Sequence, residues 1–279
     1  MKRFTKTAGI LAGIMAVLGI SFLGMAFVIG LTPTRFMAMF ENGEFRFKIT
    51  DNQLVYLKDH EVEYDEIEEG VSNIELEFPA GNLEICYGDV RDIQLEYKNA
   101  GPIGWTCDEE NLHIWKDVVF EDNSDVWLKI ILPKNTTYEK ITLDIGASLA
   151  KIEDIIAEEI HISVGAGQAE IKNLQTEKAD FEVGVGKMDV QNITAQDFDF
   201  EVGMGQMDVE VCGKESDYDY EVECGIGSVK IGDTSYSGIG TEHHSDKHGN
   251  GHHETDNENT NCKMDIDCGI GQIHVKFDD

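Results

Sequence analysis

Histidine is concentrated in one short segment of this 279-residue chain. Five of the nine histidines lie between Thr241 and Asn261, in a stretch that interrupts an otherwise regular sequence. Imidazoles mixed with carboxylates suit zinc, nickel or copper, so these histidines are candidate metal ligands. The segment has no hydrophobic residue that would fix a binding geometry, and a solvated surface loop is the alternative interpretation. The five candidates are His243, His244, His248, His252 and His253.

Acidic residues recur at fixed positions of a nineteen-residue repeat. Glu182 and Glu201 occupy one equivalent position, and Asp189 and Asp208 occupy another. Carboxylates stacked across adjacent strands repel one another, and calcium, with its flexible oxygen coordination, would relieve that repulsion. The four residues are therefore a candidate calcium ladder. The alternative is a solvated acidic surface that keeps the protein soluble and its edges unpaired.

Six cysteines raise the question of disulfides. None has CxxC spacing, which argues against zinc-ribbon or thioredoxin chemistry. Alignment of the Gly-x-Gly motifs places Cys224 and Cys268 at one inward position of stacked coils, and Cys212 at the inward position of Ile193. Strands about 4.8 Å apart fit the roughly 4.4–6.8 Å between Cα atoms that a disulfide needs. Two interpretations stay open: a disulfide between Cys224 and Cys268, or buried free thiols that pack as small hydrophobic groups.

No enzyme signature is present in the sequence. It has neither a Gly-x-Ser-x-Gly elbow nor a His-Glu-x-x-His motif, and its Gly-x-Gly pairs lack the lysine and Ser/Thr of a phosphate loop. The carboxylates recur with the repeat, as surface positions do, whereas a catalytic pair for glycan cleavage would break the pattern. We therefore expect no catalytic residues and no required cofactor.

The repeat itself must position the candidate residues. Gly146, Gly165, Gly184 and Gly203 lie nineteen residues apart, and fixed-period similarity of this length indicates stacked coils. The apolar phase shifts twice within a repeat, after Gly186-Lys187 and after Gln191-Asn192, which predicts three inward-facing runs and left-handed corners at Gly186 and Asn192. The predicted inward residues are Ala166, Ala179, Phe181, Val183, Val185, Met188, Val190, Ile193 and Ala195.

The predicted fold class is all-β, a three-sided β-solenoid of about nineteen-residue coils with one N-terminal transmembrane helix. The helix is expected in the uncharged run from Ala8 to Leu31, which is long enough to cross a hydrocarbon core of about 30 Å. Lys2, Arg3 and Lys6 precede it, so the positive-inside rule keeps the amino end in the cytoplasm. A cleaved signal peptide is the alternative. The expected localisation is the cell membrane, single-pass, with an extracytoplasmic C-terminal domain.

The expected domain organisation has four parts. Residues 1–31 form a basic flank and signal-anchor helix, and residues 32–70 form a juxtamembrane linker. Residues 71–140 form an irregular β region or a cap on the stack, and residues 141–279 form the regular array with the His-rich insert at 241–261.

Charge restricts the class of partner. The formal net charge is −32, from 54 acidic and 22 basic side chains. A nucleic-acid partner is not expected, because binding nucleic acid requires a basic patch. Besides the membrane contacted by the N-terminal helix, this charge favours divalent metals, a cationic peptide, another surface protein or an envelope component.

The sequence resembles a known bacterial family. A basic-flanked N-terminal helix, the Leu132-Pro133 pair and the repeated Val-Gly-x-Gly-x-hydrophobic runs are similar to the putative-adhesin β-strand-repeat family of membrane-anchored proteins. The resemblance implies a β-solenoid on the cell surface or in the envelope, without catalytic residues. We therefore expect a non-catalytic adhesin-like module for binding or presentation. The alternative is an accessory role in envelope-stress or metal sensing, through the His-rich insert or the acidic ladders.

Overall fold

The computed structural model describes residues 47–50, 53–56, 63–67, 70–98, 103–116, 126–134, 136–237, 252–254 and 262–278. The chain divides into two compact units, Met1–Tyr56 and Leu57–Asp279. In the first unit, the described residues form the antiparallel pair of β1 (Phe47–Thr50) and β2 (Gln53–Tyr56). The candidate sites all lie in the second unit.

The described residues of the second unit form mainly strands, together with a 3-10 turn at Glu215–Asp217. Its strands are β3 (Glu63–Ile67), β4 (Asn73–Gly88), β5 (Ile93–Lys98), β6 (Ile103–Asp108), β7 (Asn111–Lys116), β8 (Trp127–Pro133), β9 (Tyr138–Val164), β10 (Gln168–Gln175), β11 (Lys178–Val183), β12 (Lys187–Thr194), β13 (Asp197–Val202), β14 (Gln206–Cys212), β15 (Tyr218–Cys224), β16 (Ser228–Ile231), β17 (Thr234–Ser237), β18 (His252–Glu254), β19 (Cys262–Cys268) and β20 (Gln272–Asp278).

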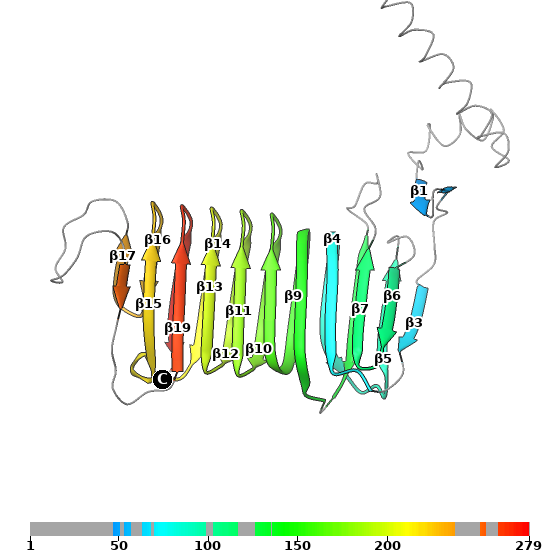
Figure 1. The fold of residues 1–279 in the computed structure, drawn as a ribbon, viewed down its shortest axis with the longest axis horizontal. Coiled ribbons are helices and arrows are strands. Elements are labelled where there is room, and N and C mark those ends of the chain that lie inside the picture. Colours follow the sequence, from blue (N-terminus) through cyan, green and yellow to red (C-terminus); the bar gives the residue numbers. More distant parts are fainter. Residues whose placement is uncertain are drawn as a thin grey trace, which may run out of the picture. The chain divides into compact units, whose positions relative to one another are not determined.

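Each repeat contributes one strand to each of two layers (Figure 1). In the layer that we call the first sheet, parallel pairing joins β7, β4, β9, β11, β13, β19 and β15. In the second sheet, parallel pairing joins β8, β4, β9, β10, β12, β14, β20 and β16. The long strands β4 and β9 take part in both sheets. The last coil of the sequence, β19–β20, lies between β13–β14 and β15–β16.

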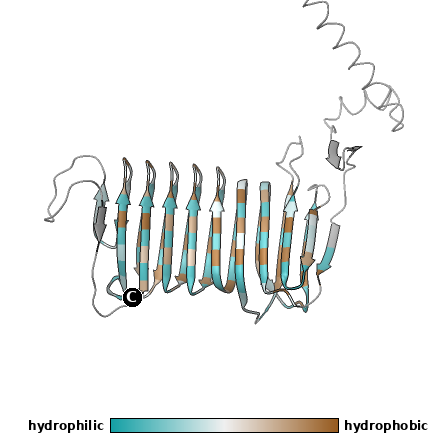
Figure 2. Cartoon of the chain, viewed as in Figure 1, coloured by the Kyte–Doolittle hydropathy of each residue, from teal (hydrophilic) through white to brown (hydrophobic). Residues whose placement is uncertain are grey.

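The hydrophobic core lies between the two sheets. Apolar and polar residues alternate along each strand, as the banded colouring in Figure 2 shows, and the apolar members point inward. Equivalent aromatic residues of successive coils stack: the rings of Phe181 and Phe200 lie 5.8 Å apart. The predicted inward positions Phe181, Val183, Met188, Val190 and Ile193 are confirmed, since all five are buried.

The predicted three-sided solenoid is wrong, because each repeat contains two strands instead of three. The second phase shift does not end a strand: β12 continues through Asn192, which adopts a left-handed φ of 59°. The pairing of β12 with β14 contains a β-bulge, because its register changes between Val190 and Ile193. Asn173 and Asp154 have similar φ angles in the preceding coils, and Asn192 donates a 3.1 Å hydrogen bond to Asn173. These stacked residues bend the strands without breaking them.

The Gly-x-Gly motifs form the turns that join the two sheets, and this corrects two predicted inward residues. Val185 is 59% exposed and Ala166 is also exposed, because each occupies the middle of such a turn. Gly186 does not have the positive φ that we expected at a corner. It is needed because a Cβ atom there would collide with the carbonyl oxygen of Gly167 in the coil below.

The predicted position of Cys212 is also wrong. Cys212 is exposed, and Val211 is the residue that lies opposite Ile193. The register shift between β12 and β14 displaces the sequence alignment by one residue at this point. Cys212 therefore lies on the outer face.

The predicted membrane topology also has to be corrected. Within the described ranges, no helix has the length and apolar character needed to cross a bilayer. The structure thus does not support the single-pass localisation or the membrane contact through an N-terminal helix. The residues on which both predictions depend, 1–31, lie outside the described residues.

Candidate functional site

The outer surface of the first sheet carries two parallel rows of carboxylates. In one row Glu182 lies opposite Glu201, and Asp267 lies opposite both Glu201 and Glu223. The other row lies two residues earlier on the same strands, β11, β13, β19 and β15. Neighbouring strands are about 4.7–4.9 Å apart, so each carboxylate has a like charge on the next strand. We call this surface the acidic face; its two rows are Asp180, Asp199, Asp265 and Glu221, and Glu182, Glu201, Asp267 and Glu223.

Little positive charge compensates the acidic face. Of the residues in its four strands, only Lys178 and Lys263 are basic. Both lie at one end, in a third row that they share with Asp197 and Asp219. The two carboxylate rows therefore carry a concentrated negative charge.

Partial burial and the neighbouring carboxylates raise the pKa values of the central residues. The pKa of Asp199 is raised by partial burial and then by the neighbouring charges of Asp180 and Asp265. The pKa of Glu201 is raised in the same way, by partial burial and then by Glu182 and Asp267. The folded protein thus holds these carboxylates in a less favourable electrostatic environment than the unfolded chain does.

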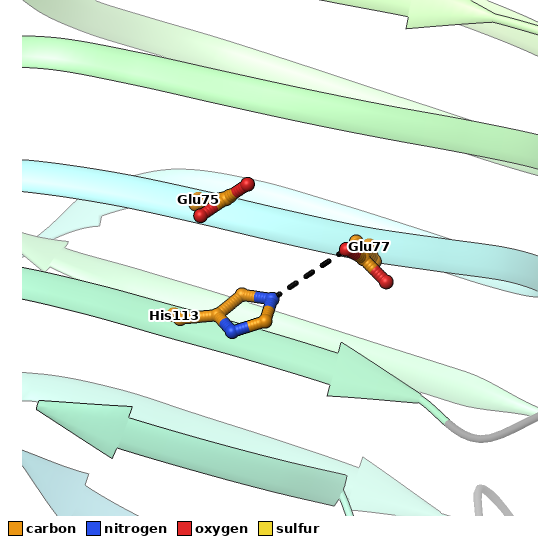
Figure 3. A group of neighbouring side chains, drawn as sticks. All are labelled: Glu75, Glu77 and His113. Carbon is orange, nitrogen blue, oxygen red and sulfur yellow. Dashed lines mark ion pairs between the residues drawn. The ribbon is translucent and has the colours of Figure 1, made fainter.

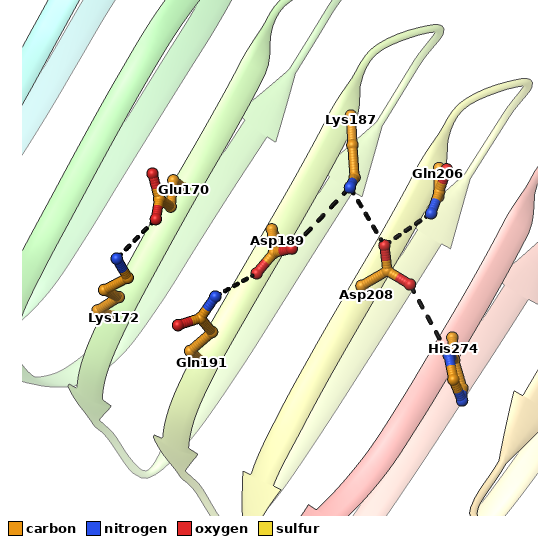
Figure 4. A network of polar contacts seen from close by, with 8 residues as sticks. All are labelled: Glu170, Lys172, Lys187, Asp189, Gln191, Gln206, Asp208 and His274. Atoms are coloured by element: carbon orange, nitrogen blue, oxygen red, sulfur yellow. Dashed lines mark hydrogen bonds and ion pairs between the residues drawn. The ribbon is translucent and has the colours of Figure 1, made fainter.

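The second sheet is also built from parallel strands, but acids and basic residues lie side by side on it (Figure 4). Lys187 Nζ lies 3.9 Å from Asp189 Oδ2 and 3.5 Å from Asp208 Oδ2, between the two residues predicted to form a calcium ladder. His274 lies 3.8 Å from the other oxygen of Asp208. On β10, β12, β14, β20 and β16 the outward acids are Glu170, Asp189, Asp208, Glu210 and Asp278, and the basic residues are Lys172, Lys187, Lys230, Lys276 and His274.

One ion pair shows the effect of this compensation. Lys172 Nζ lies 2.6 Å from Glu170 Oε1. Its hydrogen bond and charge lower the pKa of Glu170, the opposite of what happens to Glu201. The two faces therefore differ in how their side-chain charges are compensated.

A histidine lies beside the acidic face. His161 on β9 is the register partner of Asp180, and its Nδ1 atom lies 3.1 Å from Asp180 Oδ2. Together with Glu182 these residues place three potential ligand atoms within 4.8 Å of one another. The sequence analysis missed His161, although its position nineteen residues before Asp180 follows the repeat.

The structure brings the two candidate cysteines together. Cys224 and Cys268 are buried register partners on β15 and β19, and both thiols are free. Burial, followed by the neighbouring Cys224, raises the pKa of Cys268 to about 11. The disulfide stays a prediction.

The candidate ligands of the His-rich insert are only partly within the described residues. His252 and His253 belong to β18, whose backbone pairs antiparallel with β15 opposite Glu223 and Val222. His243, His244 and His248 lie outside the described residues. Metal binding by this insert stays a prediction.

Comparison with known proteins gives structural likeness only. No family model and no curated protein matches the chain. A protein from Clostridium sporogenes described as a putative cell adhesion protein is 17% identical, with a TM-score of 0.47 over 78% of this chain and 99% of that one. A protein from Bacteroides fragilis described as a putative adhesin is 11% identical, with a TM-score of 0.32 over 77% of this chain and 97% of that one. Another protein so described, from Parabacteroides merdae, is 10% identical, with a TM-score of 0.31 over 77% of this chain and 95% of that one. Likenesses at this level assign no function to this chain.

Proposed function

We propose that this protein is a non-catalytic binding module whose acidic face holds a lysine- or arginine-rich polypeptide segment. The contrast between the two sheets carries this proposal. The same repeat builds both surfaces, yet the second sheet places its own lysines beside its acids, whereas the two carboxylate rows contain no lysine or arginine on β11, β13 and β19. A cationic partner would supply the missing countercharge.

The spacing of the carboxylates suits an extended peptide. Residues two apart on one strand are separated by about 6.6–6.8 Å, which is also the repeat of same-side residues in an extended chain. A basic peptide running along the strand direction would therefore place alternate basic side chains over the two rows. Each exposed ion pair contributes only about 0–1 kcal/mol, so the affinity must come from several pairs acting together.

The strength of such binding depends on ionic strength. The screening length falls from about 10 Å at 0.1 M salt to about 3 Å at 1 M, so exposed charges lose most of their attraction at high salt. Calcium is the competing occupant of the same carboxylates, because it would relieve the same repulsion through oxygen ligands. Binding in the absence of metal distinguishes the two occupants. If the acidic face holds a basic peptide, the peptide binds without metal; if the face is a calcium site, it does not.

The test measures binding of a fluorescent octalysine peptide to the purified full-length chain in chelator. The variant Glu201→Gln/Asp265→Asn removes two charges from the acidic face. Its matched control, Glu170→Gln/Asp208→Asn, removes two charges from the second sheet. We expect at least about a tenfold loss of affinity in the first variant, equivalent to about 1.4 kcal/mol, and less than a twofold change in the control.

Three results would contradict the proposal. Equal losses in both variants would mean that the peptide responds to net charge alone. Binding unchanged between 0.05 and 0.5 M salt would show that carboxylates do not hold the peptide. Absence of peptide binding, with calcium raising the melting temperature of the chain but not of the Glu201→Gln/Asp265→Asn variant, would assign the acidic face to the metal instead.

A further inference from the structure

A second histidine of the first sheet has a buried nitrogen that makes no hydrogen bond to a described residue. His113 lies on β7, and its side chain is 38% exposed. Its Nε2 atom, however, is shielded from solvent and makes no hydrogen bond to any described residue. A buried polar atom without a partner is costly, so this nitrogen requires an explanation.

The Nε2 atom points toward a carboxylate, at a distance that is too long for a hydrogen bond. Nε2 lies 3.7 Å from Oε1 of Glu77 on β4 (Figure 3). This is too long for a hydrogen bond, which spans about 2.7–3.2 Å between heavy atoms. It is shorter than two zinc–ligand bonds end to end, about 4.0–4.3 Å, so an ion between the two atoms would make bonds of normal length at an angle of about 125°.

A third ligand is available on the same strand. Glu75 is the register partner of His113, and one oxygen of each carboxylate lies within 4.8 Å of an imidazole nitrogen of His113 and of the other carboxylate oxygen. The register of β4 with β7 fixes the backbone positions of all three residues. The ring of Trp115 lies 5.0 Å from that of His113 and flanks the cluster.

The same layout at His161 provides a comparison within the protein. His161 and His113 each have a carboxylate as register partner on the next strand and a second carboxylate two residues further on. At His161, however, Nδ1 lies 3.1 Å from Asp180, so that imidazole is already paired. Among the described residues, only the cluster around His113 combines three ligand atoms with a buried nitrogen that makes no hydrogen bond.

We propose that His113, Glu77 and Glu75 bind one divalent transition-metal ion of the zinc class. One imidazole and two carboxylates suit zinc or cobalt, whereas calcium prefers oxygen ligands alone. Three protein ligands leave a coordination position open for water or for a ligand from a partner. This site is separate from the His-rich insert, because β4, β9, β11, β13 and β19 lie between β7 and β15 in the first sheet.

The position of Trp115 makes the site measurable. Cobalt(II) is paramagnetic and quenches the fluorescence of a nearby indole, so titration of the full-length chain with cobalt should reduce tryptophan emission. Zinc, which is diamagnetic, should displace cobalt and restore the emission. Metal that binds only to the His-rich insert should leave this signal unchanged, because β18, the part of the insert that the structure describes, pairs with β15 at the other end of the first sheet.

The test compares three variants. Both His113→Gln and Glu77→Gln should raise the cobalt concentration for half-maximal quenching at least tenfold, and thermal unfolding in chelator should show that each variant is folded. His161→Gln is the matched control and should quench as the unaltered chain does. Quenching that is unchanged in His113→Gln, or that is lost equally in His161→Gln, would overturn the proposal. Because octalysine binding is measured in chelator, that assay can fail or succeed independently of this one.

Discussion

Replacing Glu201 by glutamine should stabilise the folded protein at neutral pH. Glu201 lies in the middle of its carboxylate row, directly between Glu182 and Asp267. The glutamine side chain keeps the size and shape of glutamate but removes the charge. The substitution therefore removes two like-charge contacts and leaves the buried side of β13 unchanged.

The size of the effect follows from these two contacts. Like charges directly opposite one another on neighbouring strands cost roughly 0.2–1 kcal/mol each. Glu201 is an exposed residue, so solvent screening favours the lower part of that range, about 0.5–1 kcal/mol for both contacts together. In a unit of this size each kcal/mol shifts the melting temperature by about 2–4 °C. We expect a rise of about 1–4 °C at low salt.

The pH dependence has a definite sign. The folded-state pKa of Glu201 is raised, so between the unfolded and the folded pKa the native state binds more protons than the unfolded state. The destabilising contribution of Glu201 is absent below the unfolded pKa, about 4.3, and grows as pH rises through the folded pKa. The benefit of Glu201→Gln should therefore be present at pH 7 and absent below pH 4.

The assay is thermal unfolding at both pH values in low-salt buffer with chelator. Glu170→Gln on the second sheet is the matched control, because Lys172 holds Glu170 in its charged form and lowers its pKa. That substitution should lower the melting temperature at pH 7, the opposite direction. If both substitutions change stability in the same direction, the difference in charge compensation between the two sheets does not control stability, and the reasoning is wrong.

Three further predictions concern the core and the cysteines. Val183→Asp should destabilise by at least about 3 kcal/mol because Val183 is 2% exposed, whereas Val185→Asp should be almost neutral at 59% exposure; thermal melts of the two variants would check this. Cys268, with its pKa of about 11, should react slowly with iodoacetamide at pH 7.5 until the protein is unfolded. Treatment with diamide should oxidise Cys224 and Cys268 to a disulfide, with loss of two hydrogens by mass spectrometry and a higher melting temperature.

The sequence predicted the rows of equivalent residues because parallel strands keep a constant register. A nineteen-residue period places Glu182 opposite Glu201 as soon as successive coils stack without a shift. The same reasoning failed at Val185, because the alternation in the sequence continues past Gly184 although the chain has already entered a turn. Periodicity reports which side a residue occupies only while the strand lasts.

The cluster around His113 could not be found in this way. His113 and Glu75 are 38 positions apart, which is twice the repeat period. The chain between them, however, runs through β5 and β6, which pair antiparallel with β8 and β7 and interrupt the repeat. Because of this interruption, the spacing of these residues does not by itself predict that β7 lies next to β4. The pair at His161 and Asp180, by contrast, obeys the period and was available to sequence analysis.

The order of the coils gives the His-rich insert a structural explanation that does not require metal. Because β19–β20 lies between β13–β14 and β15–β16, the chain must return past a coil that it has already formed. A tight turn cannot make that connection, and residues 238–261 provide the length. A solvated composition suits a long connection that has no core of its own to bury. The same return places Asp265 and Asp267 between the carboxylates of β13 and β15, so the coil that requires the insert also makes the acidic face continuous.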